Sequence, residues 1–156
     1  MALTPLEVLC QALPEMMAIV LCCLALLRRP WTIRPLLMVA IPLTFAVWVF
    51  RAIGLPFGVH TILISVFLAA LLVLVYRVNL RQGLIAAVLT IMLVAVFEII
   101  GGGIILVSTG WTYQDFEANQ LVHILSGLPH VILLLATALL IRTRHEGGWR
   151  RCIGLE

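Results

Sequence analysis

The sequence predicts an all-α fold: a polytopic integral membrane bundle of five transmembrane helices in one transmembrane domain, residues 1–156. Hydrophobic residues make up 63% of the chain and charged residues 11%, and the mean hydropathy is +1.20. A soluble domain has about 45–50% apolar and about 25% charged residues. The apolar runs are continuous, without the alternation that a membrane β-barrel needs. A backbone in lipid must satisfy its own hydrogen bonds, so each run is predicted to be a helix.

Arginines mark the ends of the predicted spans. Arg28, Arg51, Arg77 and Arg142 each follow a long apolar run. At about 1.5 Å per residue, the longer runs can cross a hydrocarbon core of about 30 Å. The five spans are predicted at about residues 6–27, 35–50, 60–76, 83–107 and 121 or 129–141.

The beginning of the fifth span is open between two alternatives. From Pro129 to Ile141 a helix would cover only about 20 Å, too little to cross alone. In the first alternative, the helix begins near Leu121 and kinks at Pro129. In the second, residues 120–128 lie in the outer interface and the bilayer thins locally. A short external helix at about 113–119 is predicted to precede this span, and a cytoplasmic tail, 142–156, to follow it.

The distribution of arginine predicts the orientation. All ten basic residues are arginine, and with five spans only Arg51 falls on the side of the N-terminus. The others share the opposite side: Arg28, Arg29, Arg34, Arg77, Arg81, Arg142, Arg144, Arg150 and Arg151. The positive-inside rule then places the N-terminus outside and the C-terminus inside. The predicted location is the plasma membrane, as a multi-pass protein of a bacterial inner membrane.

Ionisable residues within the spans are the candidate ligand-binding residues, because each is costly in lipid. Counted from the arginines at about 1.5 Å per residue, all of them fall in the outer half of the membrane. They are Glu15, His60, Glu98, His123 and His130. Together they predict an outward polar site that binds a cation, relays protons, or holds a peptide or small polar ligand. The alternative for each residue is an interhelical hydrogen bond or a side chain that snorkels to the surface.

Prolines and glycines are predicted to shape the helices around these residues. Pro56 and Gly58 make a stiff turn before His60, which is expected to be a partner of Glu98. Three glycines after Glu98 either allow close approach of another group or end the helix. The residues with a predicted structural or hinge role are Pro42, Pro56, Gly58, Gly101, Gly102, Gly103 and Pro129.

The sequence lacks the signatures of several function classes. It contains no nucleotide-binding motif, no GxSxG and no HExxH, so we expect no enzymatic activity and no cofactor. The four cysteines have no CxxC spacing, so we expect no metal site. The arginines separate apolar runs instead of lining one polar face, so no nucleic acid is expected. The expected partners are the lipid bilayer, a separate signalling or transport protein, and a second copy of the chain.

Three short motifs, LEVLCQALPE, LPFGVHTIL and GLPHVILLL, resemble the five-helix membrane sensor regions at the N-termini of certain Firmicute sensor histidine kinases, related to peptide-pheromone receptors. The resemblance covers about residues 5–144. It implies an outward-facing ligand-sensing bundle with Glu15, Pro56, Gly58, His60 and Pro129 at the motif positions. We expect no kinase portion, so signalling would need a separate partner, or the chain would be a stand-alone relative whose role has diverged.

The sequence alone leaves three alternative functions. The first is a non-enzymatic sensor-like or accessory signalling protein that binds a ligand or partner through its outer half. The second is a transport component, either a substrate-binding subunit or a small ion or proton carrier. The third is a structural subunit of a larger membrane complex.

Overall fold

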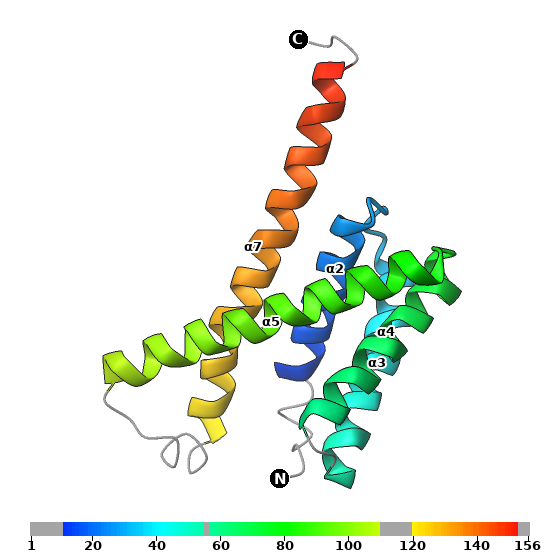
Figure 1. Ribbon diagram of the computed structural model, residues 1–156. Helices are drawn as coiled ribbons and strands as arrows, with labels where there is room; N and C mark the ends of the chain where they lie inside the picture. Colours follow the sequence, from blue (N-terminus) through cyan, green and yellow to red (C-terminus); the bar gives the residue numbers. More distant parts are fainter. Residues whose placement is uncertain (1–10, 55–56, 110–119, 153–156) are drawn as a thin grey trace.

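The computed structural model describes residues 11–54, 57–109 and 120–152, and within these ranges the chain is helical with no strand. The all-α class is therefore confirmed. The helices are α2 (Leu13–Leu26), α3 (Ile33–Ile53), α4 (Phe57–Tyr76), α5 (Leu80–Thr109) and α7 (Gln120–Cys152) (Figure 1). Each overlaps one of the five predicted spans. The external helix predicted at 113–119 lies outside the described residues.

Four of the helices are long and apolar enough to cross a membrane, which identifies the chain as a membrane protein. The apolar segments are Ile33–Phe50, Gly58–Tyr76, Leu80–Ile104 and Gly127–Arg144. Their outward faces carry large exposed apolar side chains, as expected where lipid replaces water as the solvent. The described part of α2 is also apolar but has only 14 residues.

The short helix α2 forms the centre of the bundle. It packs against α3, α5 and α7, while α4 packs against α3 and α5 (Figure 1). Its side chains are buried on nearly all faces from Ala18 to Ala25, with one partly buried exception at Leu21. Apolar residues of α3, α4 and α7, such as Leu43, Leu68 and Leu134, complete the core around it.

The ends of α2 and α4 use arginine where glycine is the usual residue. Arg28 has a φ of 54° and Arg77 a φ of 51°, both in the left-handed region. At the end of α2, the Arg28 N–H donates to the Ala25 carbonyl at 3.2 Å and the Arg29 N–H to the Leu24 carbonyl at 2.9 Å. These two bonds form a Schellman motif, which ends the helix sharply and satisfies its last carbonyls.

The last helix, α7, begins at Gln120 and continues through Pro129 to Cys152. It therefore starts upstream of the proline, as in the first alternative for the fifth span. Residues 142–152, predicted to belong to a tail, continue the same helix. Figure 1 shows α2 and α7 beginning at one end of the molecule and running in the same direction, while α5 crosses both.

Candidate ligand site between α2, α5 and α7

A carboxylate and an imidazole face each other across the contact of α2 and α7. Glu15 lies in the first turn of α2, and its Oε1 is 3.6 Å from Nε2 of His130 on α7. The side chains are 16% and 7% exposed. The distance fits an ion pair but exceeds that of a hydrogen bond. This contact unites two of the predicted ligand-binding residues.

Glu98 of α5 adds a second carboxylate to this site. Its side chain is exposed, and it interacts electrostatically with His130 without forming an ion pair with it. One turn further along α5, Gly101 is buried, and a Cβ at this position would lie 3.7 Å from Cβ of Pro129. Because residues three apart share a helix face, Glu98 lies on the side of α5 that approaches α7.

Gln11 completes the group on the α2 side. It precedes Glu15 by four residues, so both side chains lie on one face of the helical segment. The Gln11 side chain covers Gly127 of α7, where an added Cβ would meet Nε2 of Gln11 at 2.6 Å. A larger residue than glycine would therefore displace the amide. We call Gln11, Glu15, Glu98 and His130 the α2–α5–α7 cluster.

Two buried polar atoms of the α2–α5–α7 cluster lack a hydrogen-bond partner among the described residues. They are Oε1 of Gln11 and Nε2 of His130. A buried polar group without a partner costs about 1–3 kcal/mol, so it favours an occupant that completes its bonding. With one carboxylate in contact with the imidazole and a second interacting with it electrostatically, the cluster can attract a cation or exchange protons, and it offers acceptors to a hydrogen-bond donor.

The other histidines of the predicted set are placed elsewhere or lie outside the described side chains. The His60 ring is partly buried on α4 and packs edge-on against Phe50 of α3, with 6.2 Å between the ring centroids. Its predicted partnership with Glu98 stays a prediction. His123 belongs to α7, but its side chain is outside the described part.

The residues that were predicted to have a structural or hinge role lie in different environments. Of the three glycines after Glu98, only Gly101 meets another helix, while Gly102 and Gly103 have open space where a Cβ would lie. The helix does not end at them, because α5 continues to Thr109. Pro42 lies inside the continuous helix α3, and Gly58 lies near the start of α4 with open space around it. Pro56 is outside the described residues.

A second polar contact joins α2 and α5 nearer the arginines. The thiol of Cys23 donates to Oγ1 of Thr90 at 3.2 Å, and both residues are fully buried. Cys22 is also buried, and neither thiol of the pair forms a disulfide. Within the described residues, no group of three or more His, Cys, Asp or Glu side chains is arranged to hold a metal ion.

At the arginine-rich end, α7 contacts the loop between α2 and α3. The guanidinium carbon of Arg142 lies 4.5 Å from the ring centroid of Trp31, a cation–π arrangement. The same helix α7 thus carries His130 at the α2–α5–α7 cluster and Arg142 at the opposite end of the bundle. The partner of Trp31 could not be predicted from the sequence, although tryptophan is commonly found at the membrane interface, where arginines end the spans.

Sequence reasoning also missed Gly127 and Thr90. Gly127 precedes Pro129 and His130, so a small residue beside a polar one was the available signal for a close helix contact. Thr90 lies in the middle of a long apolar run, where a hydroxyl needs a partner on its own or another helix. The identity of each partner depends on the packing of the helices, which the local sequence does not specify.

The fold and this site define an all-α membrane bundle with a polar cluster between three helices. Comparison of the chain with protein-family models, with curated proteins and with solved structures finds no match. The resemblance to sensor regions of histidine kinases therefore stays an expectation.

Proposed function

We propose that this chain is a small, non-enzymatic, sensor-like membrane protein that binds a positively charged ligand or partner at the α2–α5–α7 cluster. The observation that carries the proposal is the continuity of α7, which extends unbroken from His130 to Arg142. Binding at one end would move the other end, and a separate signalling partner would read that movement. The protein would work without a cofactor.

The cluster supports a cationic ligand through its charge and its unfilled hydrogen bonds. Glu15 and Glu98 supply two carboxylates, and His130 contacts the first and interacts with the second. A guanidinium or ammonium group placed among them would form charge-assisted hydrogen bonds, which are about twice as strong as neutral ones. Such a ligand would also draw α2, α5 and α7 together, because each helix supplies part of the site.

Helix α7 supports transmission of that movement. From His130 to Arg142 it covers about 18 Å, and an α-helix of this length moves largely as one body. A rotation or shift that improves ligand contacts at His130 would therefore displace Arg142 from the Trp31 ring. The contact of His130 with Glu15 and the contact of Arg142 with Trp31 would therefore both depend on the position of α7.

We further propose five membrane spans, with the N-terminus outside and the C-terminus inside. The support is that the Trp31–Arg142 contact brings the loop after α2 and the later part of α7 to the same end of the bundle. Arg28 and Arg29 lie in that loop, so the basic residues of the first loop and of α7 share a side, as the positive-inside rule expects.

The coupling is tested with a variant in which Trp31 is the remaining tryptophan: Trp48→Phe, Trp111→Phe and Trp149→Phe. In lipid nanodiscs, His130→Gln should shift the emission of Trp31 and increase its quenching by iodide. The matched control is Ile132→Ala on the exposed face of the same helix, which should leave both signals unchanged. Unchanged Trp31 signals in both His130→Gln and Glu15→Gln would contradict the sensor proposal.

The cationic ligand is tested in the same variant with agmatine as the probe, because its guanidinium can form two hydrogen bonds with one carboxylate. Agmatine should shift the Trp31 emission saturably, and the shift should be lost in Glu15→Gln combined with Glu98→Gln. A response that persists without both carboxylates, or no response in the parent, would contradict this ligand class.

A proton or ion carrier is the second candidate function, favoured by the contact of two protonatable side chains, Glu15 and His130, and by the electrostatic interaction of His130 with Glu98. In proteoliposomes, a carrier would dissipate a pH gradient, and Glu98→Gln would abolish the flux. Flux that depends on Glu98 would replace the sensor proposal. Agmatine binding and a change in the Trp31 signal without any flux would rule out the carrier function.

A further inference from the structure

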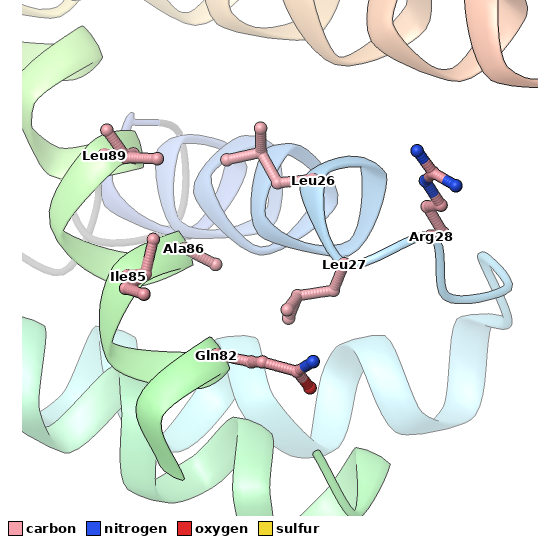
Figure 2. Close-up of a pocket in the computed structure, with 7 residues that line it drawn as sticks. All are labelled: Leu26, Leu27, Arg28, Gln82, Ile85, Ala86 and Leu89. Carbon is pink, nitrogen blue, oxygen red and sulfur yellow. The ribbon is translucent and has the colours of Figure 1, made fainter. Parts of the chain in front are cut away.

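Beyond the cluster and independently of its function, a second site lies at the arginine-rich end. We propose that the crevice between the end of α2 and the start of α5 binds one anionic phospholipid. One acyl chain would lie against its apolar wall, and the phosphate would contact Arg28 and Gln82. The crevice has a volume of about 370 Å³ (Figure 2), within the size range of small-molecule sites.

Most of the wall is apolar. Figure 2 shows Ile85, Ala86 and Leu89 on α5 opposite Leu26 and Leu27 at the end of α2. Ile85 and Leu89 are largely exposed at 50% and 46%, so their side chains are available to an acyl chain. A lipid chain in contact with these surfaces would fill the space beside the place where α2 and α5 meet, at the Cys23 thiol, which donates to the Ala86 carbonyl at 3.6 Å and to Thr90.

Two polar side chains, Arg28 and Gln82, also line the crevice. Figure 2 shows both of them away from Leu89; the amide of Gln82 is turned towards the end of α2, while the guanidinium of Arg28 points away from that amide, with Leu27 between them. The left-handed backbone of Arg28, which closes the Schellman motif, fixes where its side chain leaves the helix. Arg28 is exposed and makes no ion pair with any residue in the described ranges. Its charge is therefore available to an anion.

The start of α5 adds to the positive potential. Gln82 lies in the first turn of this 30-residue helix, where backbone N–H groups have no helical partner and the helix dipole is positive. Arg77 and Arg81 precede Gln82 in the same region. An anionic group beside Arg28 would therefore be attracted by positive potential from the end of α2 and from the start of α5.

The combination of charge and apolar wall indicates a lipid and not a free anion. Inorganic phosphate could use Arg28 and Gln82 but would leave the wall formed by Ile85 and Leu89 unoccupied. The site lies where an apolar span meets its terminal arginines, which is the depth of lipid headgroups. Basic pockets between transmembrane helices are a known form of anionic lipid site.

The proposal is tested by native mass spectrometry of the full chain in micelles titrated with phosphatidylglycerol or with phosphatidylcholine. One phosphatidylglycerol should bind in preference to phosphatidylcholine. Arg28→Gln should weaken its binding about tenfold, because a charge-assisted bond is lost while the backbone strain is kept. Arg29→Gln removes the same charge next to the crevice and is the matched control, with an expected change below about twofold.

A second variant tests the apolar wall without changing charge. Ile85→Trp fills the crevice from its exposed side and should weaken phosphatidylglycerol binding at least about tenfold. Ile99→Trp, at a 75% exposed position of the same helix, should leave it unchanged.

Three results would overturn the lipid site. They are equal losses in Arg28→Gln and Arg29→Gln, equal binding of the two lipids, and full binding in Ile85→Trp. A gain in thermal stability from inorganic phosphate equal to that from phosphatidylglycerol would also overturn it, since it would indicate an anion site alone. A stability gain from phosphatidylglycerol that Ile85→Trp removes would support the proposal.

Discussion

Glu15 and His130 belong to the first and last described helices, yet Oε1 of one lies 3.6 Å from Nε2 of the other. The pair is largely shielded from solvent and joins the first turn of α2 to a position ten residues after the start of α7 at Gln120. Such a pair ties the position of α7 to α2, so its energetic contribution is the first property to measure.

Glu15→Gln and His130→Gln should each destabilise the protein by about 1–2 kcal/mol, because each leaves a buried polar group with poorer partners. The double variant should lose less than the sum, with a coupling energy of about 1 kcal/mol. Equilibrium unfolding in mixed micelles measures all four free energies. As a control, Thr137→Ala on α7 and Glu15→Gln should have additive effects on the free energy of unfolding. The reason is that the Thr137 hydroxyl donates to the Leu133 carbonyl of its own helix. Strict additivity of Glu15→Gln and His130→Gln would contradict the pair.

The glycines after Glu98 should differ in their tolerance of a large side chain. Gly101→Leu should destabilise the protein by about 2 kcal/mol, because its side chain would overlap Pro129 of α7. Gly103→Leu should be neutral or slightly stabilising, since the position is open and leucine favours a helix over glycine. Thermal unfolding of the two variants in the same detergent gives the comparison. Equal destabilisation would show that α5 and α7 do not meet at Gly101.

Cys22 and Cys23 should resist thiol reagents in the folded protein. Both are fully buried in α2, so a maleimide reaches them only when the bundle opens. In a Cys10→Ser, Cys152→Ser background, labelling followed by mass spectrometry should be negligible in native micelles and complete in denaturant. Rapid labelling of the native protein would contradict the central position of α2.

Arg77→Gly should stabilise the protein by about 1 kcal/mol, because glycine adopts the left-handed backbone of this position without the steric cost that arginine bears. Arg77→Ala removes the same charge but keeps the strained backbone, so it should give no such gain. Unfolding free energies of the two variants separate strain from charge. A gain of equal size in Arg77→Ala would assign it to the lost charge.

The helical class and the approximate helix positions could be predicted from the sequence, because long apolar runs bounded by arginine are determined locally. The turn before α4 is a further example: Gly54 has a φ of 73° and follows the last residue of α3, where glycine is the favoured helix terminator. Helix α7 begins within one residue of the first alternative for the fifth span, and it exceeds the predicted span at its C-terminal end because the arginines after Ile141 do not interrupt it.

The arrangement of the candidate site was predicted less completely. The sequence indicated that Glu15, Glu98 and His130 share one depth, because depth follows from residue counts along each helix. It did not indicate which helices are neighbours, so it did not predict that the His60 ring packs on Phe50. Partners across helices depend on rotation and tilt, which arise from packing of all the side chains together.

The burial of α2 has a consequence for how this protein can diverge. Because α2 is covered by α3, α5 and α7, nearly every substitution between Ala18 and Ala25 changes a protein–protein contact. The lipid-facing positions of the other helices need only remain apolar. Lineages derived from this chain should therefore accumulate substitutions freely along their outward faces, while the buried residues of α2 change slowly.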